Sequence, residues 1–235
     1  MRTVATVPNW PRAVEQSTGQ AQPAAVSPPA IAASQRNRER ALGLWRGAAP
    51  ASGTLAERYL AGRGLPELAV SPALRFRTDT PHPEGDRLPA LLALVQDAAG
   101  KPLGVHRTFL GSDGYKACVE PTKASLGPIW GGAIRLLPLA SGPLIIGEGI
   151  ESAASAARML ELPAWAGISA GNIAGGLQLP PEVRHVVVAA DPDPAGERSA
   201  RAASLRWSRE GRRVQIARPT GSGDFNDMLR QTAHG

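Results

Sequence analysis

A chain of 235 residues with a net charge of +6 and a single cysteine is long enough for one or two domains with a hydrophobic core. The lone Cys118 excludes a disulfide framework and a cysteine-based zinc module, and it favours a cytoplasmic protein. No apolar stretch approaches the roughly 18–20 residues of a membrane span, so no membrane partner is expected.

The N-terminal part of the chain predicts a tail and two helices. Residues 1–35 are rich in Pro, Ala, Gln and Ser, a composition typical of a disordered tail. Residues 36–49 predict a short amphipathic helix. Thr54, followed three residues later by Glu57, has the pattern of a capping box and predicts a second helix over about 55–62.

The next stretch, to residue 140, is predicted to be rich in β-structure. Asp97 begins a sequence typical of a hairpin turn, Asp-Ala-Ala-Gly, between two apolar runs. The candidate strands are Leu88–Gln96, Gly104–Leu110 and Ile134–Leu137. Residues 36–140 are therefore expected to form a small α+β subdomain, and the positive charge of the chain lies in residues 1–140, because residues 141–235 hold as many basic as acidic residues.

From residue 141 onwards, strand and helix patterns alternate. The predicted strands are about 144–147, 164–168, 185–190 and 213–217, and the predicted helices are about 150–161, 195–210 and 225–231, with a short turn near 173–177. This alternation is typical of a parallel sheet covered by helices on both faces. The fold class is therefore α/β, with residues 141–235 as the second domain.

Acidic residues follow two of these buried strands. Glu148 comes after the apolar run 143–146, and Asp191 and Asp193 come after 185–190. Ligands bind outside the carboxyl ends of strands in open α/β sheets, and clustered carboxylates repel one another unless a cation joins them. Oxygen ligands of this kind suit Mg²⁺, with Mn²⁺ as the alternative ion. A plainer interpretation makes Asp193, before a proline, the cap of a helix.

Three further residues have both a functional and a structural interpretation. Asp224 precedes the last predicted helix and is either a metal ligand or a cap. Glu151 is expected in the first turn of a helix, where an acidic residue is favourable without any function. Trp130, in a glycine-rich loop, is either a stacking surface for a base or a packed residue, and packing is favoured.

The sequences Glu148–Ser152, Asp191–Gly196 and Asp224–Asp227 together resemble the Toprim domain, which DnaG-type primases, phage and plasmid helicase-primases, topoisomerases and some nucleases share. The resemblance implies that Glu148 and Asp191 meet on neighbouring strands. It also implies catalytic roles for Glu148, Asp191 and Asp193, and a metal-binding set made up of these three residues and Asp224. One departure is Ser152, which stands where many primases carry Asp, one residue after Glu151.

The preceding region resembles the leading part of plasmid- and phage-type Toprim primase-like proteins, on the sequences Gly53–Leu60, His106–Leu110 and Lys123–Pro128. Basic residues of this region line the template groove in related primases. The resemblance therefore implies that Arg107, Lys116 and Lys123 contact nucleic acid, although a solvated strand face is an equal alternative. The chain has no P-loop and hence no helicase motor.

The function that the resemblance implies is Mg²⁺-dependent primer synthesis on single-stranded DNA from nucleoside triphosphates, in the replication of a mobile element or plasmid. A DNA primase-type nucleotidyltransferase of this kind would work with a helicase or a zinc-bearing replication partner. Two alternatives stay open: a Toprim nuclease that hydrolyses phosphodiesters, and a non-catalytic DNA-binding replication accessory protein.

Overall fold

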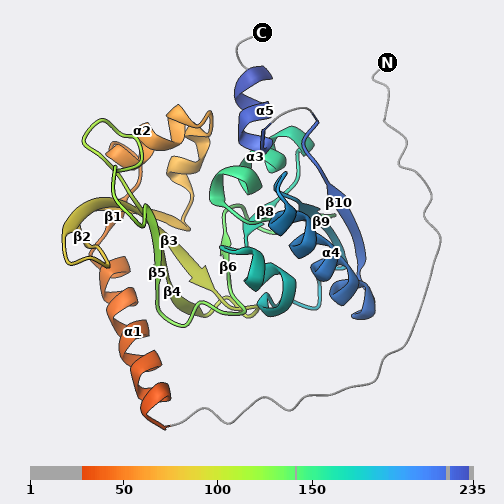
Figure 1. Cartoon of the computed structure of the whole chain (residues 1–235), viewed down its shortest axis with the longest axis horizontal. Coiled ribbons are helices and arrows are strands. Elements are labelled where there is room, and N and C mark those ends of the chain that lie inside the picture. Colours follow the sequence, from red (N-terminus) through yellow and green to blue (C-terminus); the bar gives the residue numbers. More distant parts are fainter. Residues whose placement is uncertain (1–27, 141, 221–222, 233–235) are drawn as a thin grey trace.

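The computed structural model describes residues 28–140, 142–220 and 223–232. Antiparallel strands with helices α1 and α2 lie on one side of the molecule, and parallel strands with α4 lie on the other (Figure 1). Among the helices of the described residues, none combines the length and the apolar character needed to span a membrane.

Helix α1 (Pro28–Arg46) begins earlier than the sequence predicts. Residues 28–35 were expected to belong to a disordered tail, and this part of the prediction is wrong; the remainder, 1–27, lies outside the described residues. Proline is tolerated in the first turn of a helix, and the Ala, Gln and Arg residues that follow favour helix. Ala41 and Trp45 bury this helix against a core that includes Phe109.

Helix α2 (Leu55–Gly62) has the predicted bounds and the predicted capping residues. The Thr54 side chain accepts a hydrogen bond from the backbone N–H of Ala56 at 3.1 Å. Glu57 Oε2 accepts from the N–H of Gly53 at 2.6 Å, one residue earlier than a standard capping box. The helix buries Tyr59 and its apolar neighbours, which directs the Tyr59 hydroxyl into the molecule.

The leading region contains more strands than the sequence predicts. The predicted strands and the turn at Asp97 are present, and Asp97 Oδ1 accepts from the N–H groups of Ala99 and Lys101. Strands β2 and β5 were not predicted, because their side chains are only partly buried for much of their length. The elements are β1 (Ala49–Pro50), η1 (Pro66–Val70), β2 (Leu74–Pro81), β3 (Arg87–Gln96), β4 (Pro102–Phe109) and β5 (Lys123–Leu126).

The second region is the predicted parallel α/β sheet. Its strands run in the order β8-β7-β9-β10, and all three pairings are parallel. Ile145 and Val187 face a core with α3, whereas Ile146 and Val188 face the opposite core with α4. The elements are β7 (Leu144–Gly147), α3 (Ile150–Leu160), β8 (Ala164–Ala166), the π-helical turn η2 (Asn172–Gly176), β9 (His185–Ala189), α4 (Pro194–Arg209), β10 (Arg213–Ala217) and α5 (Phe225–Thr232).

Strand β6 (Ala133–Arg135) joins the two regions into one sheet. It pairs antiparallel with β3 on one side, where Ile134 lies opposite Val95, and antiparallel with β8 on the other, where Ile134 lies opposite Ala166. The predicted division near residue 140 is therefore not a break in the sheet. Residues of the leading region can reach the carboxyl ends of the parallel strands because both regions share this backbone ladder.

Candidate active site

The carboxyl ends of β7 and β9 meet because the two strands are hydrogen-bonded neighbours, with Gly147 opposite Ala189. Glu148 follows β7 directly, and Asp191 lies two residues after β9. A pocket of ≈ 410 Å³ opens at this edge. Its lining includes Arg63, His106, Lys116, Lys123, Glu148, Glu151, Ser152, Asp191, Asp224 and Asn226.

The two carboxylates at the strand ends disfavour each other's ionisation. Burial raises the pKa of Glu148, and the negative charges of Asp191 and Asp193 raise it further. Burial also raises the pKa of Asp191, together with the charges of Asp224 and Asp193, while the hydroxyl of Ser152 acts in the opposite direction. Asp191 Oδ1 is buried and accepts no hydrogen bond from any residue that the structure describes. Such a group is costly unless a cation accompanies it.

Asp193 and Asp224 both cap helices. Asp193 Oδ1 accepts from the N–H of Gly196 at 2.7 Å, and the residue is exposed outside the pocket lining. Asp224 Oδ1 accepts from the N–H groups of Asn226 and Asp227 at 2.8 and 2.9 Å. Asp224 also lines the pocket, so the same residue caps a helix and belongs to the acidic site.

The start of α4 packs directly on the backbone of Asp191. A Cβ atom at Gly196 would lie 2.7 Å from the Asp191 carbonyl oxygen and 3.0 Å from its Cβ. Only glycine allows this approach, which holds the first turn of α4 against the end of β9. The backbone of the Asp-Pro-Asp-Pro-Ala-Gly sequence therefore fixes the position of the Asp191 Cβ atom, from which the carboxylate extends.

The carboxylates at this edge are suited to bind a divalent cation that takes only one or two ligands from the protein. Within residues 28–140, 142–220 and 223–232, no three Asp, Glu, His or Cys side chains converge tightly enough to form a metal-binding cluster by themselves. Mg²⁺ commonly takes only one or two carboxylates and completes its shell with waters and substrate phosphates. Such an ion fits the raised pKa values of Asp191 and Glu148, and it fits Asp191 Oδ1, which has no hydrogen-bond partner in the described part of the chain.

Glu151 lies beside this acidic site in a buried ionic network that was not predicted from the sequence. Glu151 is 7% exposed, and its carboxylate accepts hydrogen bonds from the Tyr59 hydroxyl and from Lys123 Nζ, the latter at 3.1 Å on Oε1 and 3.0 Å on Oε2. Lys116 Nζ lies 3.9 Å from Oε1. Burial alone would raise the pKa of Glu151, but the Lys123 charge, the Tyr59 hydrogen bond and the Lys116 charge together lower it to about 2.

Burial and the charges of this network also shift the pKa values of the neighbouring side chains. Burial and the nearby negative charge of Glu151 raise the pKa of Tyr59, so the hydroxyl keeps its proton and donates a hydrogen bond to the carboxylate. Burial, and then the charge of Lys123, lower the pKa of Lys116. Burial and the Lys123 charge lower the pKa of His106 to about 4, and its ring is therefore neutral at pH 7.

The structure treats the three predicted nucleic-acid-binding residues differently. Lys116 and Lys123 line the pocket that contains Glu148. Arg107 is 6% exposed, and its guanidinium donates to the carbonyl oxygens of Pro81, Ala124 and Ser125 at 2.6 to 3.3 Å. Arg107 thus holds strands together, and the positive charge of the pocket comes from the two lysines and from Arg63, which also lines it.

One sequence signal could have revealed Glu151. Helix α3 buries every residue from Ile150 to Ala157, and Glu151 is the only charged residue among them. A helix that is apolar almost all the way round is typically buried, and a charged residue within it needs a partner. The partners, Tyr59 and Lys123, are 92 and 28 residues away along the chain, so their identity required the fold.

Comparison with protein families divides the chain into two matched regions. Residues 143–235 match the Toprim domain, and residues 35–136 match a domain of unknown function, DUF7146. A search of curated proteins found no match.

Solved structures show the same fold across both regions. A DnaG catalytic core superposes with a TM-score of 0.58 at 20% identity, covering 83% of this chain and 76% of that one. The E. coli primase catalytic core has a TM-score of 0.55 at 17% identity, and the match covers 83% of this chain and 75% of that one. The RNA polymerase domain of Mycobacterium tuberculosis primase DnaG has a TM-score of 0.51 at 15% identity, and the match covers 84% of this chain and 82% of that one.

Proposed function

We propose that this chain, which carries a Toprim domain on the fold of a DnaG-type primase catalytic core, binds single-stranded DNA and nucleoside triphosphates and synthesises primers by metal-dependent nucleotidyl transfer. The observation that carries the proposal is the shared pocket. Glu148 and Asp191 leave adjacent strands β7 and β9 and line the same pocket as Lys116 and Lys123. The setting we propose is replication of a mobile element or plasmid in the cytoplasm.

The acidic side of the pocket would hold a divalent ion, Mg²⁺ or Mn²⁺. Asp191 and Glu148 are the main protein ligands in this proposal, with Asp224 at the rim and Asp193 beside it. When bound, the ion would neutralise phosphate charge and lower the cost of in-line attack at phosphorus. Burial raises the pKa of Glu148 in the absence of an ion, and a bound divalent ion would favour its ionised form, in which it can act as a ligand.

The basic side of the pocket would position phosphates. Lys116 and Lys123 carry two positive charges, and the buried Glu151 neutralises one of them. The remaining lysine charge and that of Arg63, which lines the same pocket, would attract a polyanionic substrate and its metal to the acidic site. Since Glu151 also fixes Lys123 through two hydrogen bonds, the ammonium group is held in place before any substrate arrives.

A primer-synthesis assay on single-stranded DNA with labelled nucleotides and Mg²⁺ tests the proposal. Glu148→Gln should eliminate product while leaving DNA binding nearly intact, because it removes a reacting group and not the basic side of the pocket. Glu161→Gln is a matched control, since this exposed carboxylate lies at the other end of α3. The control should retain full activity.

The same assay separates the alternatives. Glu148-dependent cleavage of the DNA without synthesis would assign a Toprim nuclease. Binding without extension or cleavage in Mg²⁺ or Mn²⁺ would assign a non-catalytic replication accessory protein. The assay should be repeated beside a helicase and a zinc-bearing replication protein, because Cys118 is the only cysteine of this sequence and template selection by a zinc module would come from such a partner.

A further inference from the structure

Trp130 is unlike the other tryptophans of the described residues. Trp45, Trp165 and Trp207 are buried, as expected from their apolar surroundings, but Trp130 is 66% exposed. It lies in the loop between β5 and β6. Packing, the interpretation that the sequence favoured, therefore accounts for only part of the indole surface.

The loop places Trp130 at the same edge of the sheet as the acidic site. Strand β6 is antiparallel to β8, with Ile134 opposite Ala166, so the residues before Ile134 extend beyond the carboxyl end of β8. Ala166 in turn lies opposite Gly147, the residue before Glu148. Neighbouring strands are about 4.8 Å apart, which puts β6 roughly 10 Å from β7 along this edge.

The covered side of the indole rests on a glycine backbone. A Cβ atom at Gly176 would lie 2.6 Å from Trp130 Cε2 and 2.5 Å from Asn172 Oδ1, so no other residue fits without displacing the ring or the amide. Gly131, the next residue after Trp130, donates its N–H to Asn172 Oδ1 at 2.8 Å and accepts from the N–H of Gln178 at 2.9 Å. These bonds fix the loop directly beside the indole.

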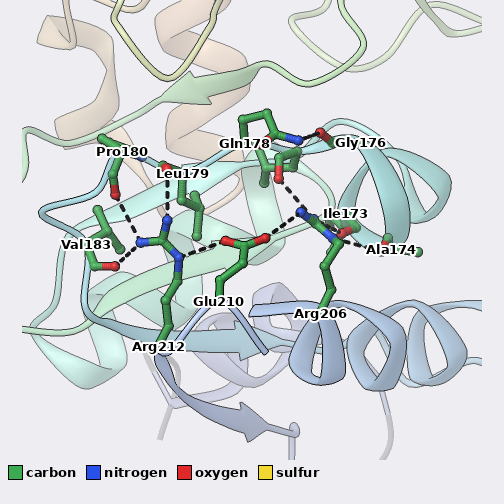
Figure 2. A network of polar contacts seen from close by, with 11 residues as sticks. Ile173, Ala174, Gly176, Gln178, Leu179, Pro180, Val183, Arg206, Glu210 and Arg212 are labelled. Carbon is green, nitrogen blue, oxygen red and sulfur yellow. Dashed lines mark hydrogen bonds and ion pairs between the residues drawn. The ribbon is translucent and has the colours of Figure 1, made fainter. Parts of the chain in front are cut away.

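The segment under the indole is itself anchored from α4 and the turn after it. Figure 2 shows the Arg206 and Arg212 guanidinium groups converging on this segment, with the Glu210 carboxylate between them. Glu210 Oε1 lies 3.4 Å from Arg206 Nη1, and Glu210 Oε2 lies 3.1 Å from Arg212 Nε. Arg206 donates to the carbonyl oxygens of Ile173, Ala174 and Leu177, and Arg212 to those of Leu179, Pro180 and Val183. The backbone segment on which Trp130 packs is thus held rigidly. The ring therefore loses little conformational freedom when a ligand covers its open side.

We propose that the open side of Trp130 stacks on an unpaired base of the DNA strand that enters the carboxylate edge. This inference rests on the proposed function and adds to it a contact outside the acidic pocket. A fixed aromatic surface suits single-stranded nucleic acid, because every base presents a π-face to it. A protein partner would require a contiguous apolar patch of a few hundred Å². Within 127–136 and 164–183, all described, no other large apolar side chain is exposed.

Equilibrium binding of a labelled oligo(dT) strand tests the stacking interaction. Trp130→Ala should weaken binding about 5- to 150-fold, the range expected when one base–aromatic stack is removed, and Trp130→Phe should retain most of the affinity. The slope of log affinity against log salt should stay unchanged, since the indole neutralises no phosphate. An oligonucleotide of the same length with abasic residues should bind wild type and Trp130→Ala equally.

Two glycine variants independently test whether the packing of the Trp130 indole on Gly176 is needed for binding. Gly176→Ala should displace the indole and reduce oligo(dT) binding, whereas Gly175→Ala should not, because its Cβ would meet only Trp130 Cζ2, at 3.9 Å. Equal oligo(dT) affinity of wild type and Trp130→Ala would overturn the stacking interaction and leave the proposed function standing. An equal reduction on the abasic strand would also overturn it. A wild-type protein that binds no DNA would refute the proposed function itself, and the stacking interaction with it.

Discussion

Replacing Glu151 by Gln should destabilise the protein by about 3 kcal/mol at pH 7. The pKa of this carboxyl falls from 4.5 to about 2 in the folded protein, and each unit corresponds to about 1.36 kcal/mol of preference for the ionised form. Removing one partner from a fully buried ion pair costs about 3–5 kcal/mol. Lys123 and Lys116 keep 30% and 32% of their side-chain surface exposed, so they regain some hydration and the destabilisation should stay near the lower value.

The pH dependence gives this prediction its sign. A carboxyl with a lowered folded-state pKa contributes stability that is fully present above its unfolded value, near 4.5, and is lost as the pH falls towards about 2. The difference in unfolding free energy between wild type and Glu151→Gln should therefore be constant from pH 7 to about pH 5. By pH 3 it should have fallen by about 2 kcal/mol.

Chemical denaturation at pH 7, 5, 4 and 3 measures this difference, and thermal unfolding at pH 7 should show a Tm lower by about 6–12 °C. Glu161→Gln, at the exposed C-terminal end of the same helix, is the control and should change stability by less than about 0.5 kcal/mol. A Glu151→Gln difference that is as large at pH 3 as at pH 7 would refute the ionic origin of the effect. A difference below about 0.5 kcal/mol at pH 7 would refute the network altogether.

Three further outcomes are expected. Mg²⁺ should raise the Tm of the wild type by linkage, and the double change Asp191→Asn and Asp193→Asn should remove that shift while keeping the fold; equal shifts in both proteins would argue against a metal at this edge. In a single-stranded DNA titration, Lys116→Ala and Lys123→Ala should each reduce the slope of log affinity against log salt by about 0.7 for every phosphate that the lysine neutralises, and an unchanged slope would place the DNA elsewhere. Asn172→Ala should lower the unfolding free energy by about 3 kcal/mol, because three backbone partners, two in the loop before β6 and one after β8, are each deprived of a hydrogen bond worth roughly 1 kcal/mol; a change within about 0.5 kcal/mol in denaturant would show that water replaces the amide.

The features that local chemistry controls were predictable from the sequence. Thr54 begins α2, and Asp193 and Asp224 cap the helices that follow them, since a cap depends only on residues two or three positions away. The parallel strands and their helices were also predictable, because β-branched runs and glycine-bounded helices repeat at short intervals. Glu148 and Asp191 could be placed at strand ends for the same reason.

The features that depend on distant residues were decided by tertiary structure. The spacing of the strands along the sequence does not pair β7 with β9; only the Toprim resemblance implied this pairing, which brings Glu148 and Asp191 to one pocket. Local reasoning put Glu151 in the first turn of a helix, where it lies, but the fold also buries it against Tyr59 and Lys123. Trp130 differs in the same way, since its exposure depends on Gly176 and the arginines beneath it. Helix caps are set by neighbours along the chain, whereas burial and charge pairing are set by whichever segments the sheet brings side by side.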